Sequence, residues 1–310
     1  MNSVFPNIFA IIVTYNGMKW YDWCLKGITS SKQLVTPIIV DNCSNDGTVE
    51  YLRKLHPECI LLPQSKNLGF GQANNKGIEY AIQHGASHIL LLNQDATIMP
   101  DTLSKLLVYD DGKHILTPIH LNGDGSRLDF LFHERSILGD AMSNGLVEDL
   151  LLHKSLKPYY PISFVNAACW LLPTTIINTI GGFNPLFFHY GEDGNYLHRV
   201  RYHNFGVRLV PNAYIYHDRV KHGNESAYHS GSLYRKFLSI ETNINLSSKE
   251  RLKQRHKIAI QQFGSALVAH DAFGFVQEWI KAKCKICRQY KAIQNSRTKE
   301  KILSPNWINI

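Results

Sequence analysis

The chain has 310 residues, of which 44% are hydrophobic and 19% are charged, an ordinary composition for a protein that buries a real core. The formal net charge is +8, yet residues 249–301 carry 13 Lys and Arg against 4 Asp and Glu, whereas the remaining residues carry 20 and 21. This asymmetry predicts either an anionic partner for the C-terminal segment (membrane surface, lipid-linked phosphate or nucleic acid) or a solvated basic helix face.

Secretion and a membrane span are not expected. The longest apolar runs, at 8–13 and 89–92, are far shorter than the ~20 residues that cross a bilayer, and the N-terminus lacks the basic flank and cleavage site of a signal peptide. The six cysteines are scattered, and the CxxC at 284–287 has no second Cys/His pair beside it. We therefore expect reduced thiols, no zinc site and a cytoplasmic protein.

The first hundred residues alternate between strand-like and helix-like segments. Strands are predicted at 8–15, 37–41, 59–63 and 87–93, and helices at 18–30, 46–55 and 70–84. Apolar runs without polar alternation are typical of strands covered on both faces. The strand–helix order predicts a mostly parallel, Rossmann-like α/β sheet flanked by helices.

The pattern is looser in the middle of the chain. Short strands are predicted at 115–121, 127–134 and 164–172, and two more at 207–211 and 213–217, after a helix that begins at the acidic pair Glu192–Asp193.

From residue 226 the composition becomes helical and basic. We therefore predict two parts, a domain of residues 1–225 and a mainly helical extension of residues 226–310. In that extension, Val276, Trp279, Ile280, Cys287 and Tyr290 form one apolar helical stripe, which can dock on the rest of the protein or lie on a membrane.

Polar residues follow all four of the first strands, at 14–16, 41–47, 67–71 and 93–95. One such cluster is explained by a turn, but four at one sheet edge indicate a ligand site, because ligands of open α/β sheets bind beyond the carboxyl ends of the strands. The chain contains neither GxGxxG in the first turn nor GxxxxGK[ST]. A nucleotide would therefore be held by side chains rather than by a dinucleotide fingerprint or a P-loop.

The residue types at these strand ends suggest particular roles. Asp41 has only acceptor oxygens, which suit the N3–H of a uracil or thymine ring. Asp95 with Asn93, and His217 from a distant strand end, offer ligands for a divalent ion that bridges a diphosphate. For His217 alone, an ordinary loop histidine would be the better explanation.

The stretch GGFNPLFFHYGED at 181–193 places two carboxylates beside aromatic residues. A carboxylate there can take the proton of an attacking hydroxyl, or it can simply stabilise the start of the following helix. Spacing alone does not separate the two interpretations.

Five motifs in order resemble the family 2 inverting glycosyltransferases of the GT-A fold, and most closely their bacterial rhamnosyltransferase-like branch. They are IIVTYN at 11–16, VDNCSNDGT at 40–48, NLGFGQANNKGI at 67–78, LLLNQDA at 90–96 and GGFNPLFFHYGED at 181–193. The resemblance spans roughly residues 7–220. It implies transfer of a sugar, rhamnose in that branch, from a UDP- or dTDP-sugar to a hydroxyl of a cell-surface or lipid-linked glycan.

The resemblance also implies residue roles. Thr14 and Asp41 match positions that contact the base, and Asp193 matches the general base. Positions along the nucleotide and diphosphate are matched by Asn67, Gly69 and Asn75. Asp95 matches the last acid of a DxD-type metal motif, and His217 a downstream metal ligand for Mn²⁺ or Mg²⁺.

One position departs from the family pattern. Asn93 stands where the first acid of the DxD-type motif is expected, which should weaken metal binding. It leaves open a second hypothesis, a non-catalytic module that binds a nucleotide sugar or a glycan. A nucleotidyltransferase is disfavoured because TYNGMKW lacks a Gly-rich basic turn.

The sequence is less informative about the acceptor and other partners. We expect the acceptor side to be lined by Trp170, His189, Tyr190 and Glu192. We expect peripheral contact of the basic extension with the inner membrane face, and no nucleic acid, because the extension contains no known module. The oligomeric state is open.

Overall fold

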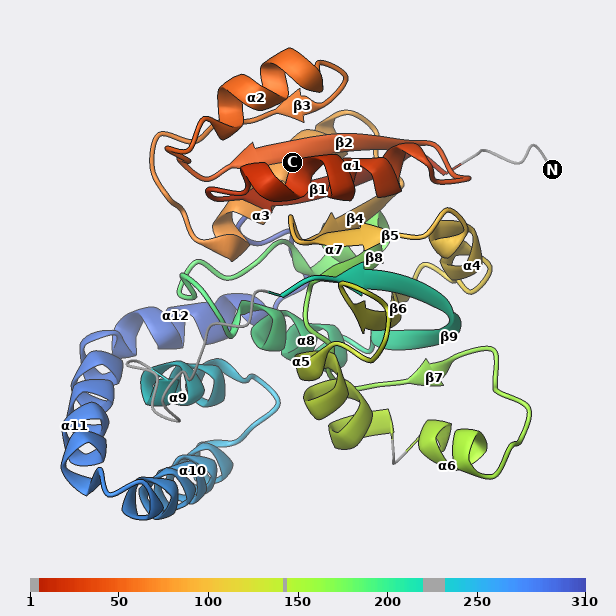
Figure 1. Cartoon of the computed structure of the whole chain (residues 1–310). Coiled ribbons are helices and arrows are strands. Elements are labelled where there is room, and N and C mark those ends of the chain that lie inside the picture. Colours follow the sequence, from red (N-terminus) through yellow and green to blue (C-terminus); the bar gives the residue numbers. More distant parts are fainter. Residues whose placement is uncertain (1–5, 142–143, 220–231) are drawn as a thin grey trace.

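A computed structural model describes residues 6–141, 144–219 and 232–310 (Figure 1). The strands are β1 Ile8–Thr14, β2 Val35–Asp41, β3 Ile60–Leu61, β4 His88–Leu92, β5 Ala96–Ile98, β6 His114–Asn122, β7 Tyr160–Pro161, β8 Cys169–Pro173 and β9 Gly206–His217. The helices are η1 Met18–Trp20, α1 Tyr21–Thr29, α2 Thr48–Leu55, α3 Phe70–Gln83, α4 Thr102–Leu107, α5 Phe130–Phe132, η2 His133–Ala141, α6 Leu146–Leu151, α7 Thr174–Ile180, α8 Glu192–Tyr202, α9 Ser232–Thr242, α10 Ser248–Val268, α11 Ala272–Arg288 and α12 Tyr290–Glu300.

Within the described residues the strands form one mixed sheet in the order β3-β2-β1-β4-β8-β6-β9-β5, with β7 paired to β9. Strands β3, β2, β1 and β4 are parallel to one another. Strand β8 runs antiparallel between β4 and β6, and β6 is parallel to β9. The predicted α/β sheet, mostly parallel and flanked by helices, is confirmed.

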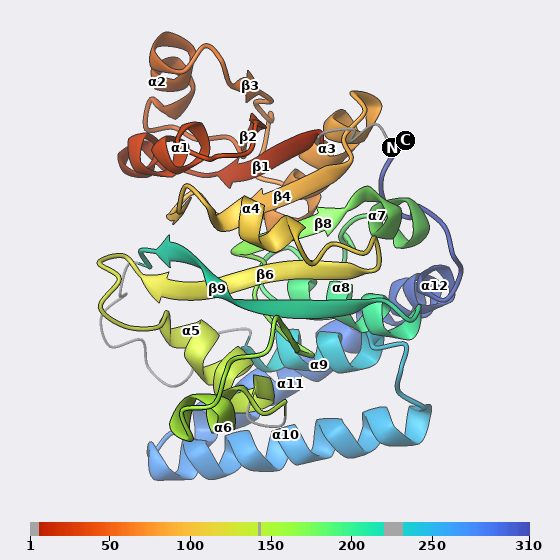
Figure 2. The ribbon, with the colours of Figure 1, turned by 90° about the vertical axis from the view of Figure 1, so that its right-hand side faces the viewer.

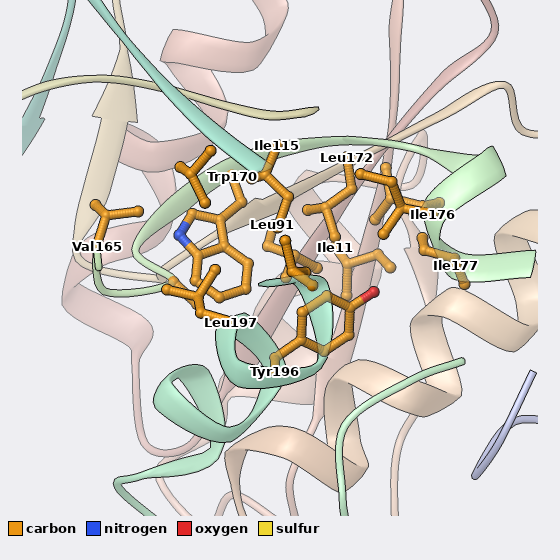
Figure 3. Packing of buried hydrophobic residues seen from close by; sticks show 14 of the residues in the cluster. Ile11, Leu91, Ile115, Val165, Trp170, Leu172, Ile176, Ile177, Tyr196 and Leu197 are labelled. Atoms are coloured by element: carbon orange, nitrogen blue, oxygen red, sulfur yellow. The ribbon is translucent and has the colours of Figure 1, made fainter. Parts of the chain in front are cut away.

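The central strands are buried on both faces, as their uninterrupted apolar sequences predict. Alternate residues of a strand point to opposite faces. Ile11 and Leu91 therefore belong to one apolar cluster, and Ile12 and Leu90 to the other. Figure 3 shows the first cluster, in which Ile11 and Leu91 pack near side chains from β8 and α8.

Two predicted elements are corrected by the structure. The segment 127–134 is not a strand: Asp129 caps a short helix by accepting a hydrogen bond from the Phe132 N–H at 2.9 Å, and helical turns continue from there. The two strands predicted around 207–217 are one strand, β9. Its pairing with β6 jumps from Val210 to Tyr214, so that residues 211–213 bulge at a proline, which has no N–H to donate.

The C-terminal helices are confirmed, and α10 begins at the capping box of Ser247 and Glu250. Figures 1 and 2 show α9, α10 and α11 on the side of the molecule opposite β3 and α2. The chain then returns, and Ile308 packs in the main core. The predicted boundary between residues 225 and 226 lies outside the described residues and stays a prediction. No helix in the described parts of the chain is both long and apolar enough to cross a bilayer.

Candidate active site

A cleft of about 390 Å³ opens beyond the carboxyl ends of β1, β2 and β4, where the strand-end polar residues are expected to meet. Its size is within the range of small-molecule sites. The described residues that line it are Val13, Tyr15, Asn42, Asn67, Gly69, Phe70, Asn93, Gln94, Asp95, Phe188, His189, Tyr190 and Arg219. Six predicted site residues are therefore in the lining, namely Asn67, Gly69, Asn93, Asp95, His189 and Tyr190.

Gly69 lies where the chain must pass close to the 188–190 segment. Its φ of +79° is in a region that L side chains rarely adopt, and a Cβ built there would be 1.9 Å from the Phe188 carbonyl oxygen. The next residue, Phe70, donates its N–H to the same oxygen at 3.2 Å. Only glycine allows this junction, which joins two walls of the cleft.

Asn42 and Asn67 hold the floor of the cleft in place. The Asn42 amide donates to Asn67 Oδ1 at 2.9 Å, and its oxygen accepts the Leu68 N–H at 2.7 Å. Asn67 Oδ1 also accepts the Gly69 N–H at 2.8 Å. These bonds order the loop before α3, where a ligand can approach the backbone.

Asp41 and Thr14 lie just behind the lining residues. Asp41 is 2% exposed; its Oδ2 accepts the Ser44 N–H at 3.1 Å, whereas its buried Oδ1 has no partner among the described residues. An unpaired buried acceptor is costly and therefore points to a missing donor. The Thr14 hydroxyl is fully buried and donates to Gln94 Oε1 at 2.7 Å, so its neighbours Val13 and Tyr15 line the cleft instead.

Asn93, Asp95 and His217 meet at one point. His217 Nε2 is 3.2 Å from Asp95 Oδ1 and 3.3 Å from the Asn93 amide nitrogen, although His217 ends a strand more than 120 residues away in sequence. Burial acts to raise the pKa of Asp95, but the hydrogen bond and charge of His217 and the charge of Arg219 outweigh it and lower the pKa. Asp95 is therefore ionised at neutral pH.

The side chains of this group are of types that can bind a divalent metal ion. A carboxylate, an imidazole nitrogen and an amide, whose oxygen faces His217 when the amide is rotated, suit Mn²⁺ or Mg²⁺. In the part of the chain that the structure describes, no three His, Cys, Asp or Glu side chains cluster in this way. An ion held here would therefore take further oxygens from water or from a substrate phosphate.

The acidic pair at the start of α8 lies in the opposite electrostatic environment. Glu192 is buried, and no residue that the structure describes is hydrogen-bonded to its Oε2. Burial and the charge of Asp193 raise the pKa of Glu192 to about 8. Burial also raises the pKa of Asp193, whose Oδ1 accepts the Gly194 N–H at 2.7 Å. Neither acid is part of the cleft lining, but Tyr190, two residues before them, is.

Two predicted site residues belong to the core instead. Asn75 on α3 is buried, and its amide is hydrogen-bonded to both backbone groups of Phe183 and to the Trp307 carbonyl, so it ties the C-terminus to the sheet domain rather than contacting a nucleotide. Trp170 is fully buried, and Figure 3 shows its ring packed in the core near Leu197. It cannot line an acceptor site because α8 covers it.

Seven lining residues are not among the predicted site residues, namely Val13, Tyr15, Asn42, Phe70, Gln94, Phe188 and Arg219. Gln94 lies inside the predicted 93–95 cluster, and Arg219 lies two positions after His217, so proximity to predicted residues is the signal that could have found these two.

Comparisons with known proteins relate the chain to glycosyltransferases. Residues 9–149 match the profile of glycosyl transferase family 2. The chain is 25% identical over 227 residues to dTDP-rhamnosyl transferase RfbF of Shigella flexneri, and the aligned region covers 70% of each protein. It is 24% identical over 253 residues to N-acetylglucosaminyl-diphospho-decaprenol L-rhamnosyltransferase of Mycobacterium tuberculosis, covering 74% of this chain and 81% of the relative.

Solved structures share the fold. TarS residues 1–349 of S. aureus, in complex with UDP-GlcNAc, superposes with a TM-score of 0.61 at 15% identity, over 95% of this chain and 90% of that one. The mannosyltransferase PcManGT of Pyrobaculum calidifontis, in complex with GDP-Man and Mn²⁺, does so with a TM-score of 0.56 at 15% identity, over 96% and 86%.

Proposed function

We propose that this chain is an inverting transferase that uses a nucleoside-diphosphate sugar. The chain belongs to glycosyltransferase family 2, has the GT-A fold and is distantly homologous to bacterial rhamnosyltransferases. The acceptor would be a hydroxyl of a lipid-linked or cell-surface glycan. Rhamnose from a dTDP donor is the sugar we favour, on the names of the two rhamnosyltransferase relatives. The observation that carries the proposal is that Asn93, Asp95 and His217 lie together at the cleft, whose neighbour Asp41 has a buried Oδ1 without a partner among the described residues.

In this proposal the donor's base lies near Asp41. The buried Oδ1 of Asp41, which none of the described residues engages, would accept the N3–H of uracil or thymine. Asn93, Asp95 and His217 would hold Mn²⁺ or Mg²⁺, which would offset charge on the departing diphosphate.

Asp193 is the base we assign to the reaction. The acceptor oxygen attacks the sugar C1, the bond from C1 to the diphosphate oxygen breaks, and the hydroxyl proton passes to a carboxylate oxygen of Asp193. A single displacement of this kind inverts the configuration at C1. The raised pKa of Asp193 supports the assignment, because a base works best when its pKa approaches the working pH.

A donor screen tests the proposal directly. Purified protein is incubated with UDP-, dTDP- and GDP-sugars in Mn²⁺, Mg²⁺ or EDTA, release of nucleoside diphosphate is measured, and donor binding is followed by calorimetry. We expect binding of one donor class and slow, metal-dependent release. Asp41→Asn should weaken that binding, whereas Asp22→Asn, at an exposed acid of α1, should not. Absence of both release and binding for every donor would overturn the proposal.

Asn93 favours one alternative, a non-catalytic module that holds a nucleotide sugar for a partner enzyme. A neutral amide in place of an acid weakens metal binding, and a transferase that depends on its metal loses activity when the metal is lost. Donor binding without any metal-dependent release, with or without candidate acceptors, would favour this alternative.

We also propose that α11 contacts an anionic membrane surface. The opposite face of this helix packs on α9 through Phe275 and Ile286, which leaves Phe273 75% and Ile280 50% exposed among lysines of the basic segment. An apolar stripe flanked by cations fits lipid headgroups and acyl chains.

Vesicle flotation tests the membrane contact. The protein should float with vesicles that contain phosphatidylglycerol, and less with phosphatidylcholine alone. Phe273→Ser with Ile280→Ser should abolish flotation, whereas Val108→Ser, a 71% exposed residue elsewhere, should not. Equal flotation of all three proteins would exclude this surface.

A further inference from the structure

Asp129 is a buried carboxylate that no step of the proposed reaction uses. It is 2% exposed and lies at the start of α5, where its Oδ1 accepts the Phe132 N–H at 2.9 Å. Its own N–H donates to the His120 carbonyl at 2.9 Å, which fixes it against β6, beside the end of β9. A charged group is buried at a cost unless it is paired, so the partners of its second oxygen identify its role.

That second oxygen faces Arg219, which lines the cleft, and His217, which lies buried behind it. Asp129 Oδ2 accepts the Arg219 Nε–H at 2.7 Å and is 3.5 Å from His217 Nδ1. The latter separation is long for a hydrogen bond, but in the described part of the chain Nδ1 has no other partner. One carboxylate therefore bridges a candidate metal ligand and an arginine that lines the cleft.

Arg219 brings the positive charge that a diphosphate needs. Among the described residues that line the cleft it is the only Lys or Arg, and it is 30% exposed. Asp129 takes the Nε–H, and a guanidinium has four further N–H donors, in a planar fork that matches phosphate oxygens. The charge of Arg219 also reaches Asp95.

We propose that Arg219 binds the donor diphosphate and that Asp129 is a positioning residue, which holds the Arg219 guanidinium and the His217 ring in place. The proposal rests on the proposed function. A carboxylate behind a metal-ligating histidine fixes its ring and tautomer, and loss of such a partner typically lowers metal affinity about 10–100-fold.

Two binding measurements test it without turnover. Calorimetry compares UDP and dTDP with uridine and thymidine, and electron paramagnetic resonance follows Mn²⁺ without nucleotide. Arg219→Gln should weaken diphosphate binding about 10-fold or more, leaving the nucleoside unaffected. Asp129→Asn should weaken both diphosphate and Mn²⁺ binding, each about 10-fold. Arg127→Gln, which removes an exposed charge from the same turn, should change neither.

The outcomes separate the two proposals. If the wild-type protein binds no nucleoside diphosphate, the proposed function itself fails. If it binds one and Arg219→Gln binds it equally well, or loses nucleoside affinity to the same extent, Arg219 is not a diphosphate ligand. Unchanged Mn²⁺ and diphosphate affinities in Asp129→Asn would overturn the positioning role. If Asp129→Asn fails to fold, Arg219→Lys is measured instead. This variant keeps a positive charge but lacks the Nε–H bond to Asp129, and it should lose most of the diphosphate affinity.

Discussion

Two acidic groups of the site, Asp95 and the pair Glu192–Asp193, have pKa values that are shifted in opposite directions. Asp95 lies beside His217 and Arg219, and its pKa is lowered despite burial. Glu192 and Asp193 are adjacent acids in a poorly solvated place, and both pKa values are raised. Environments that separate the pKa values of carboxyl groups in this way indicate different roles. The first group suits a permanent negative ligand, and the second suits proton transfer.

The largest effect should come from the proton-transfer group. We expect Asp193→Asn to lower turnover by about 10²–10⁴-fold, because an amide cannot accept the acceptor's proton. Donor and Mn²⁺ affinity, measured by calorimetry, should stay within error of the wild type. A variant that retains wild-type turnover would remove Asp193 from the mechanism.

The corresponding substitution at Asp95 should affect metal binding first. Asp95→Asn should lower Mn²⁺ affinity about 10–100-fold or more, the range typical for loss of a second-sphere partner, since it removes the carboxylate that lies 3.2 Å from His217 Nε2. Electron paramagnetic resonance of free Mn²⁺ measures this loss. Equal Mn²⁺ affinity in Asp95→Asn and the wild type would place the metal elsewhere.

Placing an acid at position 93 should strengthen metal binding near Asp95. We expect Asn93→Asp to raise Mn²⁺ affinity about tenfold, because affinity for hard cations follows the number of charged ligands. The same resonance titration reports it. Unchanged affinity would show that residue 93 is not part of the coordination sphere.

The smallest effect concerns stability. Glu192 has a folded pKa of about 8 against an ordinary 4.5, so between these values the unfolded chain has released a proton that the folded protein retains. Wild-type stability must therefore fall as pH rises from about 4.5 to 8. Glu192→Gln lacks this pH-dependent loss of stability, so the Tm of the variant minus the Tm of the wild type should be larger at pH 8 than at pH 5, with about 2–4 °C for each kcal/mol of difference.

Scanning calorimetry at the two pH values measures this difference. The reverse trend, or an equal difference at both pH values, would mean that Glu192 is ionised in the folded protein at neutral pH.

Local sequence was sufficient for the first half of the sheet. The strands at 8–14, 35–41 and 88–92 are short apolar runs that end in turn-forming polar residues, and both signals act over a few neighbouring positions. For that reason the amino-acid sequence alone predicts that Asn67, Gly69, Asn93 and Asp95 lie at one sheet edge.

Tertiary structure decided the points that depend on distant partners. Asn75 belongs to the same sequence motif as Gly69. Its side chain is nevertheless hydrogen-bonded to Phe183 and Trp307, which lie 108 and 232 residues away in the sequence. The segment at 127–134 is rich in apolar residues that also occur in strands, but Asp129 and its partners at 217–219 make it a turn and a helix start. Apolar period and turn chemistry are local properties and can be read from sequence, whereas burial and pairing depend on which residues the fold brings together.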